Sequence, residues 1–162
     1  MGPEPFRTIA AAMDYPVFIV TTRSPEGVPA GCLVGFATQA SIAPPRFIAA
    51  ISRVNHTFPA AMAAAVVAVH LPGRDQVELA RLFGEASGEE IDKFANCRWH
   101  EGPEGVPVLD DCPAWIAGPV RERVNLGDHV GLLVDIAHAH DAGLGLQLRA
   151  SDIRGMEPGH PA

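Results

Sequence analysis

The chain has little positive charge and almost no lysine. Among its 162 residues, 12 are lysine or arginine and 19 are aspartate or glutamate, so the formal net charge is −7 and the pI is near 5.4. Lys93 is the single lysine. A protein that binds the phosphate backbone of a nucleic acid needs a basic face. We therefore expect no nucleic-acid partner.

Cysteines and long apolar runs are also scarce. The three cysteines, Cys32, Cys97 and Cys112, are odd in number and show no C-x-x-C spacing, so a disulfide framework is not expected. The longest mostly apolar run, residues 58–71, is too short to span a bilayer. The first residues show no secretory signal. The sequence predicts a cytoplasmic protein with no membrane partner.

Several enzyme motifs are missing. The sequence contains no G-x-G-x-x-G, no phosphate-binding P-loop and no G-x-S-x-G nucleophile motif. A nicotinamide nucleotide would therefore have to bind without a Rossmann fold. His138 and His140 form an H-x-H pair, but no convincing set of further ligands accompanies them. We expect no metal site.

The remaining composition is that of an ordinary globular domain. Apolar residues make up 48% and charged residues 19% of the chain, and this length is enough to bury one core. We expect one domain over residues 1–150. Residues 151–162, which include Pro158, Gly159 and Pro161, are predicted to form a loosely held tail.

Hydrophobic periodicity and turn residues predict short strands interspersed with helices. Such a pattern is typical of a β-barrel with helical decoration. The expected helices cover residues 5–13, 57–65, 75–85 and 89–95. The expected strands cover residues 17–22, 28–39, 46–53, 66–71, 106–109, 114–124, 129–139 and 144–148.

The segment from Gly31 to Thr57 carries the strongest signal. Gly31 and Gly35 lie inside an expected strand, where glycine indicates a bulge or a ligand close to the backbone. A polar cluster of Ser52, Asn55 and Thr57 then precedes a helix. The cluster could be a simple helix cap, with a contribution of about 1 kcal/mol, or a phosphate site at the helix N-terminus. The residues alone favour the cap.

Five elements in order resemble the flavin reductase-like family, and the resemblance covers roughly residues 6–141. No single element is specific, but five in register make coincidence improbable. They are the hydroxyl-bearing stretch 38–41, Pro44-Pro45, the Ser52/Asn55/Thr57 cluster, Asp92-Lys93-Phe94 and Gly127-Asp128-His129.

The resemblance implies a mainly β fold, the FMN-binding split β-barrel, which is a Greek-key antiparallel barrel of six to eight strands with a few peripheral helices. It also implies a homodimer. The implied activity is that of an NAD(P)H-dependent flavin reductase, which transfers hydride from NADH or NADPH to FMN or FAD and supplies reduced flavin to a separate monooxygenase. The alternative is a protein that holds FMN tightly and serves electron transfer or reduces another small molecule.

The same resemblance assigns roles to individual residues. His129 is the expected catalytic residue, beside both flavin and nicotinamide, where it orients them. The family often has a second hydroxyl residue where this chain has Gln39, and a polar residue near the position of Val34. These departures give the alternative some weight. Among the residues expected to bind the cofactor, Arg53 is a weaker candidate than Ser52, Asn55 and Thr57, because an arginine at a strand end is usually solvated. The expected cofactor-binding residues are Leu33, Val34, Gly35, Phe36 and Thr38 along the isoalloxazine, and Ser52, Arg53, Asn55, Thr57 and Lys93 at the ribityl chain or phosphate.

Overall fold

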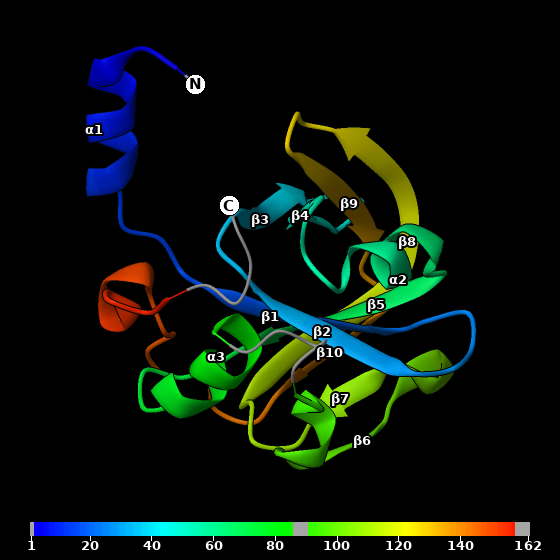
Figure 1. Cartoon of the computed structure of the whole chain (residues 1–162). Helices are drawn as coiled ribbons and strands as arrows, with labels where there is room; N and C mark the ends of the chain where they lie inside the picture. Colours follow the sequence, from blue (N-terminus) through cyan, green and yellow to red (C-terminus); the bar gives the residue numbers. More distant parts are fainter. Residues whose placement is uncertain (1, 86–90, 158–162) are drawn as a thin grey trace.

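The computed structural model describes residues 2–85 and 91–157. Strands dominate these residues, and helices are few and short (Figure 1). The α-helices are α1 (Glu4–Ala12), α2 (Phe58–Ala63) and α3 (Val77–Gly84), and the 3₁₀ helices are η1 (Lys93–Ala95), η2 (Pro103–Gly105) and η3 (Ala150–Ile153). The strands are β1 (Phe18–Arg23), β2 (Pro29–Val34), β3 (Ala37–Ser41), β4 (Arg46–Ser52), β5 (Val66–Leu71), β6 (Trp99–Glu101), β7 (Pro107–Leu109), β8 (Ala114–Asn125), β9 (His129–Asp135) and β10 (His138–Asp141).

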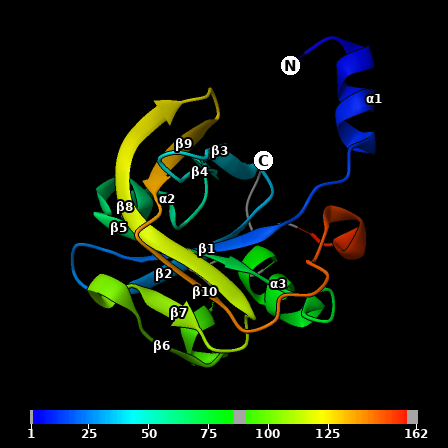
Figure 2. The same ribbon diagram turned by 180° about the vertical axis from the view of Figure 1, so that it is seen from behind.

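Eight of the strands form one antiparallel sheet. Its hydrogen-bonded order is β2-β1-β5-β8-β9-β4-β3, and β10 pairs with β8 beside this path. The two end strands, β2 and β3, follow each other in the chain but share no ladder among the described residues. The sheet curls so that its two halves face different directions (Figures 1 and 2). The fold is therefore mainly β, with an open seam between β2 and β3.

The long strand β8 belongs to both halves of the sheet. Its first residues pair with β5 and β10, and its residues from Val120 onward pair with β9. The chain bends between these two sets of partners, with a register shift after Val120. A Cβ at Gly118 would collide with the carbonyl oxygen of Asp135. Only glycine leaves room for this approach of two backbones.

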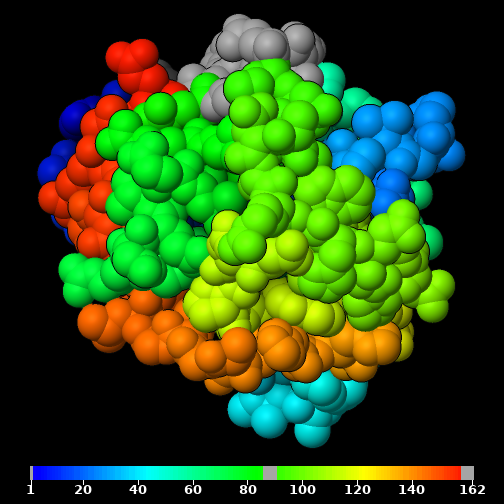
Figure 3. All heavy atoms as spheres, turned by 90° about the horizontal axis from the view of Figure 1, so that it is seen from below, coloured from blue at the N-terminus to red at the C-terminus, as the bar shows by residue number. Residues whose placement is uncertain are grey.

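The described residues form four apolar clusters, and two of them frame the site. The larger one lies between the sheet halves and α2, and includes Val20, Ile51 and Leu132. The second joins Ile19 and Phe83 to the segment from η1 to β7. In the space-filling view of Figure 3, α3 and this segment lie side by side on one face of the molecule.

A buried histidine ties three strands together. His70 on β5 is fully buried. Its Nδ1 is 3.0 Å from the carbonyl oxygen of Ile19, and its Nε2 accepts a hydrogen bond of 3.0 Å from the backbone N–H of Leu109. These two bonds require a neutral ring with the proton on Nδ1. Burial lowers the pKa of His70 to about 4.

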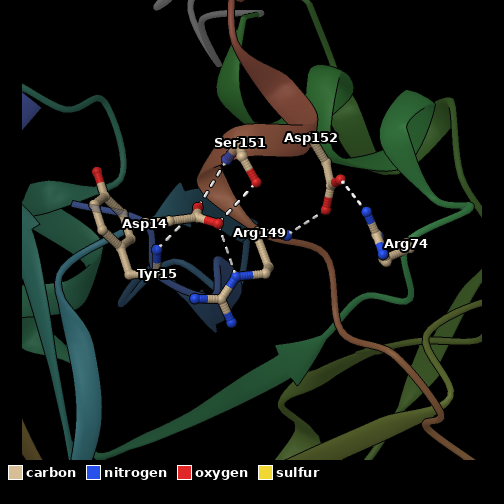
Figure 4. A network of polar contacts seen from close by, with 6 residues as sticks. All are labelled: Asp14, Tyr15, Arg74, Arg149, Ser151 and Asp152. Carbon is tan, nitrogen blue, oxygen red and sulfur yellow. Dashed lines mark hydrogen bonds and ion pairs between the residues drawn. The ribbon is translucent and has the colours of Figure 1, made fainter. Parts of the chain in front are cut away.

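The hydrogen bonds of Asp14 join the two ends of the described chain (Figure 4). Its carboxylate accepts bonds from the guanidinium of Arg149 and from the backbone and hydroxyl of Ser151. Asp152 also pairs with Arg74. The separation of a domain over 1–150 from a tail over 151–162 remains a proposal, and residues 158–162 lie outside the described residues.

Most predicted elements are confirmed with ends shifted by a few residues. The helix predicted over 75–85 is α3, and the helix over 57–65 is the shorter α2. Of the helix predicted over 89–95, residues 89 and 90 lie outside the described residues, and η1 covers only 93–95.

Three strand predictions are wrong. The single strand over 28–39 is two strands, β2 and β3, separated at Gly35 and Phe36. The strand over 129–139 is likewise divided into β9 and β10. Residues 144–148 form no strand and make one isolated bridge, between Gln147 and Gly73. The sequence pattern also failed to predict β6.

Among the described residues, no helix has the length and apolar character needed to cross a bilayer.

Candidate functional site

The break between β2 and β3 presents an aromatic ring to solvent. Phe36 is 59% exposed, although its carbonyl oxygen accepts a hydrogen bond from Ala50 on β4. Its ring centroid lies 5.1 Å from that of His129 and 6.3 Å from that of Tyr15. A Cβ at Gly35 would come within 2.8 Å of the Tyr15 ring. Glycine at this position therefore allows Tyr15 to pack beside the break.

His129 opens β9 and faces the same side as Phe36. It is the ladder partner of Ser52, the last residue of β4. Its Nδ1 lies 2.7 Å from the carboxylate of Asp128, which fixes the ring if Nδ1 carries the proton. This hydrogen bond lowers the pKa of Asp128. The Nε2 atom is then the ring nitrogen left to interact with a bound molecule.

The residues that follow β4 support this corner. Arg53 donates from Nε to the carbonyl oxygen of Gly127 and from Nη2 to the side chain of Asn125. Its backbone N–H also bonds to the carbonyl oxygen of Asp128. Arg53 therefore holds the turn that delivers His129.

The polar cluster does not cap α2 in the way that the sequence suggested. Asn55 Oδ1 accepts a hydrogen bond from the backbone N–H of Thr57, but the Thr57 side chain makes no capping bond. Thr57 is 2% exposed and hydrogen-bonds to the thiol of Cys32. The prediction that the Thr57 side chain caps α2 is therefore wrong. The hydroxyl group interacts instead with Cys32 on the neighbouring strand β2. Burial raises the pKa of Cys32 to about 11, which leaves an inert thiol.

Lys93 is buried beside Thr57. Its Nζ donates hydrogen bonds to the carbonyl oxygens of Gly31 (3.2 Å) and Phe83 (3.0 Å), and only 7% of the residue is exposed. Burial lowers the pKa of this ammonium. Both Lys93 and Thr57 line a pocket of about 690 Å³ between the β1–β2 hairpin, α2 and η1.

The structure brings some of the predicted residues together and separates others. Phe36, Ser52 and His129 meet at the break, and Thr57 and Lys93 meet at the pocket. Val34 is 4% exposed and packs in the core, and Leu33 packs toward α3. Thr38 pairs with Ile48, four residues along β4 from Ser52.

Sequence reasoning missed several residues of this region. Tyr15 lies beside Phe36, and the pocket wall includes Val28, Pro29 and Trp99. The pocket combines three segments that are far apart in the chain. No local pattern brings such segments together, although the small residues Pro29, Ala30 and Gly31 after the hairpin turn were a weak signal of close approach.

Comparison with known proteins identifies the class. Residues 10–148 match the flavin reductase like domain, so the chain belongs to this family. It is 29% identical over 140 residues to the FMN reductase (NADH) RutF of Pseudomonas syringae, which covers 85% of this chain and 78% of that protein. It is 30% identical over 133 residues to the flavin-dependent monooxygenase reductase subunit HsaB of Rhodococcus jostii, covering 80% of this chain and 64% of the relative.

Other relatives bear on length and fold. The chain spans only 45% of the length of a probable flavin reductase from Rhizobium meliloti, to which it is 23% identical over 142 residues, or 88% of this chain. The crystal structure of a flavin reductase domain protein from Arthrobacter superposes with a TM-score of 0.83 at 24% identity, and covers 98% of this chain and 94% of that one. This similarity shows that the two chains share a fold.

Proposed function

We propose that this protein is an NAD(P)H-dependent flavin reductase, which transfers hydride from NADH or NADPH to FMN or FAD. The observation that carries the proposal is the pairing of Phe36 with His129 at an open break in the sheet of a flavin reductase-like chain. Relatives named as FMN reductase (NADH) support the same activity.

The residues present fit a flavin. An isoalloxazine is a planar, largely apolar ring system, and the exposed ring of Phe36 offers it an aromatic surface. A flavin phosphate is an anion, and Lys93 provides a buried cation at the pocket edge. We therefore assign Phe36 and His129 to the ring, and Ser52, Thr57 and Lys93 to the chain that ends in phosphate.

When bound, the flavin supplies the hydride-accepting atom, and the protein supplies alignment and exclusion of water. His129 orients the bound rings through Nε2, because Asp128 occupies its Nδ1. Arg53 keeps this histidine in place through the turn at Gly127. Leu33 and Val34 contribute through their backbone, since their side chains face the interior.

The experiment is to follow the oxidation of NADH and NADPH by the purified protein with and without added FMN or FAD. Turnover that requires flavin supports the reductase. A yellow protein that neither NADH nor NADPH bleaches would instead indicate a protein that holds FMN for electron transfer, and a chain that binds no flavin would overturn both.

We extend the proposal to architecture, partners and location. The open seam between β2 and β3 supports a split barrel. The helix α1 projects from the body (Figures 1 and 2). Its Phe6 and Ile9, and Met13 directly after it, are more than half exposed, which supports a homodimer that covers them. The relative HsaB supports a separate monooxygenase as the recipient of reduced flavin. A cytoplasmic location stays a prediction. Light scattering on the purified protein tests the dimer.

A further inference from the structure

The pocket beside Lys93 is larger than a phosphate group requires. Its volume of about 690 Å³ lies within the range of about 300–1,000 Å³ that is typical of sites for whole small molecules. It opens between the β1–β2 hairpin, the start of α2 and residues 91–99. A site for phosphate alone would be a small polar cradle, so this pocket has room for a further group.

The walls of this pocket favour a flat, apolar group. They include aromatic and aliphatic side chains, and the indole of Trp99 is held in place by an Nε1 hydrogen bond to the carbonyl oxygen of Phe94. Arg23 lies over the Trp99 ring at 5.5 Å. The apolar lining residues that carry this argument are Val28, Pro29, Ala60, Ile91, Phe94 and Trp99. A purine base can pack against such apolar side chains, whereas a phosphate group cannot.

Two charged residues, Asp92 and Lys93, line the pocket, and the Asp92 carboxylate accepts hydrogen bonds from the backbone N–H groups of Phe94 and Ala95. Lys93 bonds to two backbone carbonyl oxygens, and the salt bridges of the described residues give it no carboxylate partner. An ammonium has three N–H donors. A buried ammonium that interacts only with carbonyl dipoles would be stabilised by an anion nearby.

The spacing along β2 separates this pocket from the ring-binding corner. Gly31 lines the pocket, and Phe36 lies five residues later. At the rise of an extended strand this corresponds to at most about 17 Å. A mononucleotide with its ring at Phe36 would bring only its phosphate toward Lys93. A dinucleotide would continue past Lys93 and place its second base between the apolar walls.

We propose that this pocket binds the adenosine end of FAD, so that the protein takes FAD in preference to FMN. The inference rests on the proposed function, because it takes the isoalloxazine to lie at Phe36 and His129. Lys93 then lies beside the phosphates that join the two halves of FAD.

The first test uses the unmodified protein. Isothermal titration with FAD and with FMN should give a dissociation constant about tenfold or more lower for FAD, a difference of about 1.4 kcal/mol. Adenosine, which has no phosphate to compete at Lys93, should raise the apparent dissociation constant of FAD and leave that of FMN unchanged. Equal affinities for the two flavins, or adenosine that competes with neither flavin or with both, would overturn the proposal.

The second test fills the pocket. Ala30 lines it and is half-buried, so Ala30→Trp should bring the ratio of FAD affinity to FMN affinity close to one. The matched control is Ala142→Trp, at an exposed alanine outside the pocket, which should keep the wild-type ratio. If Ala30→Trp fails to fold, the adenosine competition decides alone. A variant that keeps the wild-type ratio but shows a raised KM for NADH would assign the pocket to the nicotinamide nucleotide and overturn our assignment.

The outcomes separate this inference from the proposed function. If FAD and FMN bind equally well and NADH still reduces both, the reductase stands and the adenosine pocket falls. If neither flavin binds, the proposed function fails first.

Discussion

Phe36 and His129 are more than ninety residues apart in the chain, and the centroids of their rings lie 5.1 Å apart with an interplanar angle of 49°. Phe36 follows β2, and His129 begins β9. The strand β4 joins them, because Ala50 bonds to the Phe36 carbonyl oxygen and Ser52 pairs with His129. The corner is therefore built by the sheet and not by a local motif.

Replacing Phe36 by alanine should weaken flavin binding about tenfold, since an aromatic contact contributes about 0.5–1.5 kcal/mol beyond its area. Flavin titration measures the effect. The side chain is 59% exposed, so the melting temperature should change little. Ile42→Ala, at an 83% exposed position, is the control. An unchanged flavin affinity in Phe36→Ala would remove Phe36 from the site.

His129→Ala should slow flavin reduction by NADH by about 10- to 100-fold, because loss of an orienting group misaligns the reacting rings. Stopped-flow absorbance at saturating flavin isolates this step. His138→Ala, at an exposed position on β10, should react at the wild-type rate. Wild-type kinetics in His129→Ala would show that the histidine has no orienting role.

Arg53→Met should loosen the turn at 125–128 and slow reduction while flavin affinity stays within a factor of a few. Its guanidinium makes two hydrogen bonds to this turn, and bonds of charged groups contribute at most about 1.5–3 kcal/mol each when they are buried. Hydrogen exchange of the peptide that contains residues 125–129 should accelerate about tenfold or more. Arg7→Met on the exposed helix α1 is the control. Unaltered exchange would mean that the turn is stable without Arg53.

The stability of the fold should fall in acid because of His70. Its pKa is about 4 in the folded protein and 6.5 in the unfolded chain, so the unfolded chain binds the extra proton between these values. The free energy of unfolding should be unaffected by His70 above pH 6.5 and decrease by about 3 kcal/mol as the pH falls to 4. Urea unfolding across this range measures the loss. His70→Gln should show a flatter pH dependence than wild type, and His138→Gln should not.

Asp14→Asn should free the segment around η3 from the start of β1. The hydrogen bonds from Arg149 and Ser151 lower the pKa of Asp14 to about 2, so the carboxylate stabilises the fold above pH 3.8 and this contribution is lost as the pH falls toward 2. The amide of Ser151 should exchange faster in the variant at neutral pH. Glu26→Gln, in the exposed hairpin turn, provides the comparison. Equal protection of Ser151 in both proteins would contradict this role of Asp14.

Much of the fold could be predicted from local patterns. The strands β1, β4 and β5 are short apolar segments between turn residues, and α3 has a clear helical period. The break after Val34 could not be predicted, because residues 28–39 keep the composition of one strand. The division is tertiary: β2 pairs with β1, whereas the chain from Phe36 onward bonds to β4. The strand β6 has three residues and exists only because β7 pairs with it.

The candidate site could be predicted only in part, because local patterns name residues but do not reveal their tertiary contacts. His129 was named because a motif carries it and Phe36 because of its place in the expected strand, and the structure places their rings in contact. The side chains of Thr57 and Lys93 instead turn toward Cys32, Gly31 and Phe83. Sequence spacing does not reveal which side of a loop faces the core, so the pocket wall at Trp99 was missed.

The shared strand β8 has a consequence for unfolding. Since it contributes hydrogen bonds to both halves of the sheet, neither half can separate without exposing backbone groups of the other. Melting followed by near-UV and far-UV circular dichroism should therefore give one coincident transition. The corner formed by Phe36 and His129 and the pocket beside Lys93 should lose their shape at the same temperature.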